Sequence, residues 1–223
     1  MKNKFNTLWS SYKSHFGQKD FLQSFILSLV MICVALIINF YAGTYATVHA
    51  SNAVTDVVLN NIRAFDVDGL FVWGTFVFWA FLILVCLLYI RRAPFIFKTL
   101  SLFIIIRSVF ISLTHIGPFP SQIFISPVDL ISKFSFGGDL FFSGHTGIPF
   151  LLMLIFWDIK YLRITFLLSS VFFGTVVLLG HLHYSIDVLS AFFITYTIFH
   201  ISEILFSKDL NMYKNETTMN VVS

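Results

Sequence analysis

Residues 21–43 read FLQSFILSLVMICVALIINFYAG, an apolar run of 23 residues without a charged side chain. A hydrocarbon core about 30 Å thick is crossed by a helix of roughly 20 such residues. The run is too long for the apolar part of a signal peptide, and twenty polar-leaning residues precede it. The segment therefore predicts a membrane-spanning helix near the start of the chain.

The composition of the whole chain is that of a membrane protein. Of its 223 residues, 57% are apolar and 11% are charged, whereas about 25% are charged in an average soluble domain. The mean hydropathy is +0.87. These values exclude an ordinary soluble domain and a disordered chain, and two cysteines are too few for a disulfide-built secreted module. The net charge of +3 is too small to indicate a nucleic-acid partner.

Five further apolar stretches follow the first run. They cover residues 69–90, 93–114, 140–157, 164–180 and 184–206. The sequence contains no internal repeat and no linker long enough to separate two domains. We therefore predict an all-α integral membrane protein with six transmembrane helices in a single bundle at 21–206.

Lysine and arginine are distributed unevenly between the two sides of this predicted bundle. Eleven of the 14 fall in the two tails and near the loops before residues 93 and 164, two lie on the opposite side, and Arg107 lies within a span. Because cytoplasmic loops carry an excess of these residues, both termini should be cytoplasmic. Residues 1–20 are then a cytoplasmic tail, either frayed or an interfacial helix, and 207–223 form a second cytoplasmic tail.

Polar side chains gather in two segments at the predicted non-cytoplasmic surface. The first segment is GGDLFFSGHT at 137–146, and the second is HLHYSIDV at 181–188. They open the fourth and sixth predicted spans, so they meet the membrane at one depth. Because ionisable groups inside a membrane are costly and are usually functional, these segments indicate a site.

The residue types in these segments suit phosphoryl transfer. His183 and Asp187 are four residues apart and share a helix face, so the carboxylate can fix the imidazole tautomer and leave the other ring nitrogen as a nucleophile or base. Ser143, Gly144 and His145 lie at a helix start, where free backbone N–H groups favour a phosphate. A phosphohistidine mechanism would then rest on positioning and charge stabilisation.

Other readings of the same residues stay open. Arg107 either adds a bidentate phosphate contact or pairs with a neighbour. Asp139 either caps the fourth span or supports His145. A zinc site built from the histidines and Asp187, as in an ion transporter, is a further alternative, although no additional acidic or cysteine ligand accompanies them.

The two segments resemble the two signature motifs of the sphingomyelin synthase family, which belongs to the type 2 phosphatidic acid phosphatase superfamily. The matching residues are Gly-Asp-x-x-x-Ser-Gly-His-Thr at 138–146 and His-Tyr-Ser-x-Asp-Val-x-x-Ala at 183–191. Arg107, six residues and Thr114 are similar to part of a third motif. The resemblance covers the third to sixth predicted spans.

The resemblance implies a His/His/Asp active site. His183 would be the nucleophile that takes the phosphoryl group, and Asp187 would orient it. His145 would protonate the leaving group and then deprotonate the acceptor. No metal and no cofactor would be needed. Binding of phosphate oxygens and support of the site would fall to Arg107, Ser143, Gly144 and Asp139.

Two departures from the superfamily's ordinary phosphatases narrow the expected function. No arginine lies between residues 164 and 207, where those enzymes carry one, and Arg107 is followed by Ser108 instead of proline. We therefore expect a membrane lipid phosphotransferase that moves a phospho-headgroup from a membrane phospholipid to a lipid hydroxyl, or to water. The alternatives are a lipid phosphate or diphosphate phosphatase and, from another class, a non-enzymatic lipid or ion transporter on the same fold.

Overall fold

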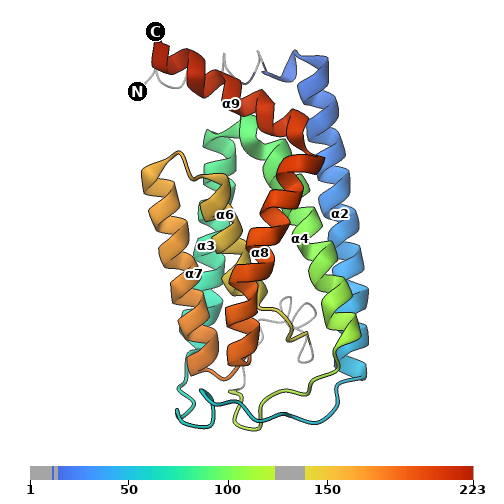
Figure 1. Ribbon diagram of the computed structural model, residues 1–223, viewed down its shortest axis with the longest axis vertical. Helices are drawn as coiled ribbons and strands as arrows, with labels where there is room; N and C mark the ends of the chain where they lie inside the picture. The colour runs from blue at the N-terminus through green and yellow to red at the C-terminus, as the bar shows by residue number, and fades with distance from the viewer. Residues whose placement is uncertain (1–11, 13–14, 124–138, 223) are drawn as a thin grey trace.

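The computed structural model describes residues 12, 15–123 and 139–222, and over these ranges the chain folds into helices without strands. In Figure 1 the long helices run side by side along one axis, α6 lies among them, and α9 lies across the end where α2 begins. The elements are α2 (Lys19–Val48), α3 (Asp68–Leu88), the 3-10 helix η1 (Ile90–Arg92), α4 (Ala93–Leu113), α6 (Gly144–Ile155), α7 (Lys160–Leu179), α8 (Ser185–Leu205) and α9 (Ser207–Val222).

Five helices in the described ranges are long and apolar enough to cross a membrane: α2, α3, α4 together with η1, α7 and α8. The expected span at 140–157 is instead α6, which has only 12 residues. At 1.5 Å per residue it rises about 18 Å, well short of the roughly 30 Å hydrocarbon core. The prediction of six full-length spans is therefore wrong, whereas the all-helical membrane architecture is confirmed.

A helix cap and a contact from another helix decide where α6 begins. Ser143 forms the N-cap, so helical geometry begins only at Gly144. The residues before the cap are not helical, and the backbone carbonyl of Phe142 is bound by the side chain of Arg107. A tertiary contact thus takes the first residues of the apolar stretch out of the helix.

The core of the bundle forms around α6, which buries eight of its 12 residues. Gly147 marks the tightest approach of α4, α6 and α8. A Cβ at this position would lie 2.7 Å from the Phe103 ring and 2.9 Å from the Thr195 hydroxyl. In contrast, α2 packs mainly against α4 and leaves most of its apolar side chains exposed, as expected for a helix that faces lipid.

Residues 207–223, expected as a tail, mostly form helix α9, and a buried polar cluster fixes this helix to the bundle. The Lys98 ammonium donates to Asp209 Oδ2 and to Ser24 Oγ, each at 2.6 Å, and the Ser24 hydroxyl donates to the other Asp209 oxygen. The side chains of Lys98 and Asp209 are only 8% and 5% exposed. The cluster therefore joins α2, α4 and α9.

Arg92 makes a second attachment at the same end. Its guanidinium pairs with both carboxylate oxygens of Asp158, at 2.8 Å for the Nη1–Oδ1 pair, and Nη1 also donates to the Ile155 carbonyl at 3.2 Å. The ring of Tyr213 in α9 lies under the guanidinium at 4.5 Å. Arg92 thus links the end of α6 to α9.

We expect Lys98→Met to destabilise the protein by about 3–5 kcal/mol, because it leaves the Asp209 carboxylate buried without a counter-charge. The double variant Lys98→Met/Asp209→Leu should lose clearly less, since both charges are removed. Unfolding in detergent, followed by circular dichroism, measures both. Lys214→Met is the matched control, because the Lys214–Glu203 pair is at the surface and its loss should cost about 1 kcal/mol or less. Equal losses in the single and double variants would contradict this account.

Candidate functional site

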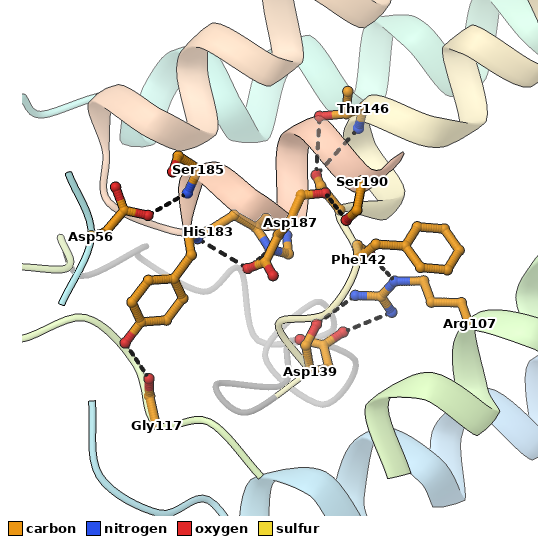
Figure 2. Close-up of polar contacts among 12 residues, drawn as sticks. Asp56, Arg107, Gly117, Asp139, Phe142, Thr146, His183, Ser185, Asp187 and Ser190 are labelled. Atoms are coloured by element: carbon orange, nitrogen blue, oxygen red, sulfur yellow. Dashed lines mark hydrogen bonds and ion pairs between the residues drawn. The ribbon is translucent and has the colours of Figure 1, made fainter. Parts of the chain in front are cut away.

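The two polar segments meet toward the end of the bundle opposite α9 (Figure 1). They are bonded directly, because the Ser143 backbone N–H donates to the Asp187 carbonyl oxygen at 3.1 Å. The start of α6 therefore lies against the first turn of α8. Figure 2 shows the polar groups that surround this junction.

His183 and Asp187 form a buried pair at the start of α8. Nδ1 of His183 lies 3.4 Å from Asp187 Oδ2, and the two side chains are 9% and 0% exposed. The same Oδ2 accepts the Tyr184 backbone N–H at 3.0 Å, which completes a capping box for α8. One carboxylate oxygen thus caps the helix and approaches the imidazole. This arrangement leaves Nε2 of His183 outside the pair.

The first turn of α6 presents backbone N–H groups to the same region. Ser143 Oγ accepts the Thr146 N–H at 3.3 Å and the Thr146 hydroxyl at 3.1 Å. The amides of Gly144 and His145 precede Thr146, so they have no carbonyl partner inside the helix. Such a helix start favours an anion. Because Ser143 is the cap, the alternative that Asp139 caps this helix is excluded.

His145 stands on the first turn of α6, between two aromatic rings. Its ring centroid is 4.5 Å from that of Phe71 on α3 and 6.0 Å from that of Phe173 on α7. The helix starts that carry His145 and His183 are joined by the hydrogen bond from the Ser143 amide to the Asp187 carbonyl.

Arg107 reaches from α4 to the segment that precedes α6. Nε donates to the Phe142 carbonyl at 2.7 Å, Nη1 lies 3.2 Å from Asp139 Oδ2, and Nη2 donates to the Asp139 carbonyl. A Cβ on Gly144 would lie 3.5 Å from Arg107 Nε, so the guanidinium packs over the helix start. Arginine has five N–H donors, and two remain after these contacts. Pairing with a neighbour is therefore observed, and phosphate binding by Arg107 stays a prediction.

Asp139 lies beside Arg107. Its carboxylate pairs with the guanidinium at 3.2 Å, and among the described residues no contact between Asp139 and His145 is seen. Any support for His145 is thus indirect, through the position of residues 139–143. Gly137 and Gly138 of the same segment lie outside the described residues.

Sequence reasoning missed Asp56, which holds the start of α8 from the first loop. Asp56 Oδ2 accepts the Ser185 N–H at 2.7 Å, and Oδ1 accepts the N–H groups of Val58 and Leu59 at 2.8 and 3.0 Å. The side chain is buried. In the sequence, Asp56 stands out only as an acidic residue in an apolar part of the loop. That feature does not identify Ser185 as its partner.

Tyr184, also missed, attaches two loops to the same helix start. Its hydroxyl donates to the Gly117 carbonyl at 2.8 Å and accepts the Val54 N–H at 3.2 Å. The loops after α2 and after α4 are therefore both hydrogen-bonded to Tyr184. Together with Asp56 they fix the backbone that carries the His183–Asp187 pair (Figure 2).

The described residues contain no group of three or more histidine, cysteine, aspartate or glutamate side chains placed to hold a metal ion. The histidines of the two segments are instead engaged with aromatic rings, a carboxylate and a hydroxyl. His181, for example, places Nδ1 2.6 Å from Ser121 Oγ. This part of the chain gives no support to the zinc-site alternative.

Residues 137–204 match the family described as PAP2 superfamily C-terminal. The match supports the type 2 phosphatidic acid phosphatase superfamily. The matched range contains both polar segments, helices α6 and α7, and all of α8 except Leu205. This part of the fold builds the junction. No curated protein and no solved structure matches the chain.

Asp56 should give the protein a stability that depends on pH. Burial by itself would raise the pKa of this carboxyl, but hydrogen bonds from the backbone of Leu59, Ser185 and Val58, and from the Ser185 side chain, bring the pKa below its ordinary value. A carboxyl whose pKa is lower in the folded state stabilises the protein above its unfolded pKa, and this contribution is lost as the pH falls through the folded pKa.

We therefore expect Asp56→Ala to be less stable than the wild type at pH 7, and the difference to shrink as the pH falls below about 4. Thermal unfolding in detergent between pH 7 and pH 3 measures this. Asp66→Ala, in the same loop and exposed, is the control. A difference that stays constant over this range would show that the carboxylate charge of Asp56 does not matter.

Proposed function

We propose that the chain is a membrane lipid phosphotransferase that passes a phospho-headgroup from a phospholipid to a lipid hydroxyl through a phosphohistidine on His183. One observation carries the proposal, the 3.1 Å hydrogen bond between the Ser143 amide and the Asp187 carbonyl. It joins an anion-binding helix start to a buried His–Asp pair. A phosphate held by the amides of α6 would therefore lie next to a candidate nucleophile.

In the first step, Nε2 of His183 attacks the phosphorus atom and the bond from phosphorus to the lipid oxygen breaks. Asp187 favours the tautomer with a proton on Nδ1 and stabilises the positive charge that develops on the ring. The step requires a proton on His145, which the negative charge of the bound phosphate favours, and His145 gives this proton to the leaving lipid oxygen. The products are a free lipid alcohol and a phosphohistidine that keeps the headgroup.

In the second step, neutral His145 takes the proton of the acceptor hydroxyl. The acceptor oxygen attacks phosphorus, the P–N bond to His183 breaks, and both histidines return to their starting forms. In both steps, phosphoryl transfer is accelerated mainly by positioning and by stabilising the charge on the phosphate oxygens. The amides of Gly144 and His145, the Ser143 hydroxyl and the two remaining N–H donors of Arg107 supply it.

A lipid phosphate phosphatase is the second candidate, favoured by the match to the phosphatase superfamily. It shares the first step and differs in admitting water to the phosphohistidine. The absence of an arginine between residues 164 and 207 favours transfer. The short loops also leave no large soluble domain, so the acceptor is drawn from the membrane surface, where lipid hydroxyls are concentrated. Both enzyme candidates explain the His–Asp pair better than a transporter does.

Purified protein in mixed vesicles tests the proposal. The vesicles contain a glycerophospholipid labelled in its headgroup and either ceramide or diacylglycerol as acceptor. Label in a new phospholipid supports transfer, whereas release of only soluble phosphate or phospho-headgroup with either acceptor makes the protein a hydrolase. Chelators should leave turnover intact, and vanadate, which mimics pentacoordinate phosphorus, should inhibit it.

His145→Ala, His183→Ala and Asp187→Asn should each lower turnover in this assay by at least about a hundredfold. Because the three groups act as one unit, a double variant should be little worse than the singles. His200→Ala is the matched control, since His200 is exposed on α8 and pairs with Glu203. Near-wild-type turnover in His183→Ala would remove the proposed intermediate.

We also propose that both termini are cytoplasmic and that the site faces the other side. The connections between α3 and α4 and between α6 and α7 lie at the end of the bundle where α2 begins (Figure 1), and Arg91, Arg92, Lys160 and Arg163 lie in these connections or in the first turn of the helix that follows. A positive excess at one end marks the cytoplasmic side.

A cysteine at Val57, which is 83% exposed, should therefore react with an impermeant maleimide in intact cells. A cysteine at Ser207 should react only after the cells are opened. The native Cys33 and Cys86 are first replaced by alanine. The reverse labelling pattern would invert the proposed orientation.

A further inference from the structure

A groove of about 540 Å³ opens between α3 and α7. It exists because α3 presents Gly69 and Gly74, and α7 presents the small Thr165 and Ser169, where the two helices face each other. Phe78 and Phe173 both line the groove, and their rings pack edge-on with 5.8 Å between the centroids. The groove therefore lies between two helices and contains a packed aromatic pair in its lining.

The chemistry of the lining fits hydrocarbon. Aromatic and aliphatic side chains make up most of it. The Ser169 hydroxyl donates to the Thr165 carbonyl at 2.9 Å within α7, so its hydrogen is already used. A headgroup would find no charged partner there, whereas an apolar chain would replace lipid or water without losing hydrogen bonds.

The dimensions of the groove match one leaflet. Along α3 the lining extends from Gly69 to Phe81, a rise of about 18 Å. Half of the hydrocarbon core is about 15 Å thick. Helix α3 begins at the end of the bundle that holds the candidate site (Figure 1). The lining therefore starts at this end, at Gly69, and continues along α3 toward mid-membrane.

The groove also adjoins the site. Phe173 lines it, and the same ring lies 6.0 Å by centroid from the ring of His145. His145 packs on its other side against Phe71 of α3, at 4.5 Å. The ring of Phe173 thus separates the groove from a residue of the candidate site.

We propose that this groove binds an acyl chain of the lipid whose phosphate enters the site. The inference rests on the proposed function for the identity of the headgroup partner, and it adds that one acyl chain of the substrate lies between α3 and α7. A chain that fills the groove from the site to mid-membrane would hold the phosphate near His145. Chains too short to reach Phe81 would leave part of the groove empty and bind more weakly.

The test uses a phospholipid with a diazirine in the middle of one acyl chain, irradiated in vesicles with the protein. Peptides that carry the lipid are identified by mass spectrometry. The label should fall on α3 and α7 at the groove, in the wild type and equally in His183→Ala, because binding of the chain does not require turnover.

Ser169→Leu should reduce this labelling about tenfold, since the leucine takes the space of roughly two methylene groups of the chain. Thr175→Leu is the matched control, because Thr175 is exposed on α7 and does not line the groove. Gly74→Leu is a second groove variant. A Cβ there already lies 3.3 Å from the Phe172 ring, so folding of this variant is checked by its unfolding temperature.

Label spread evenly over the lipid-facing helices, or unchanged labelling in Ser169→Leu, would overturn the inference. So would efficient crosslinking between copies through a cysteine at Leu70, which would show that a second copy of the chain covers the groove. A failure of the proposed function gives a different result. The photoreactive lipid then still labels α3 and α7, but vesicles with a labelled headgroup yield neither a new phospholipid nor a soluble product.

Discussion

A bilayer offers no water to polar groups in its interior, so every polar side chain within the bundle must find its partner in the protein. In the described part of the chain, three buried basic side chains meet this constraint with acidic partners, at two levels of the bundle. At one end, Lys98 and Arg92 are neutralised by Asp209 and Asp158. At the other, Arg107 is neutralised by Asp139. Between these levels the helices contact each other almost entirely through apolar side chains and a few small residues.

Asp187 meets this constraint only in part. Its carboxylate is fully buried; Oδ2 serves both the Tyr184 amide and His183, while Oδ1 has no hydrogen-bond partner among the described residues. A half-satisfied carboxylate costs free energy that an ordinary helix cap would not need. Retaining it is understandable if the charge has a task, such as stabilising a positive imidazole beside it. On the proposed mechanism, the 3.4 Å contact to His183 would shorten when a substrate binds.

The sequence predicted much of the fold because hydrophobic length is a local property. The long apolar runs correspond to α2, α3, α4, α7 and α8, with ends displaced by a few residues. The run at 140–157 was misjudged because a contact from another helix, Arg107 to Phe142, decides where α6 begins. The two residues are 35 positions apart, so a stretch of sequence of helix length does not contain both.

At the candidate site, too, the sequence did not reveal contacts between residues that are far apart along the chain. His183 and Asp187 were paired correctly from their spacing, and the two segments were placed at one depth from the order of the spans. Asp56 was not found because it acts on Ser185, 129 residues away. The role of Tyr184 depends likewise on Val54 and Gly117. Such partners become visible only when the loops are folded over the helix start.

The buried cluster of Lys98, Ser24 and Asp209 imposes an order on the assembly of the bundle. Lys98 and Asp209 are 111 residues apart, so α4 enters the membrane long before its counter-charge is synthesised. Until α9 emerges, the ammonium has only the Ser24 hydroxyl of an earlier helix, or the headgroup region that a lysine near a helix start can reach. Membrane insertion of α2 to α8 and closure of the bundle are thus separate events during translation, and the second waits for the last helix.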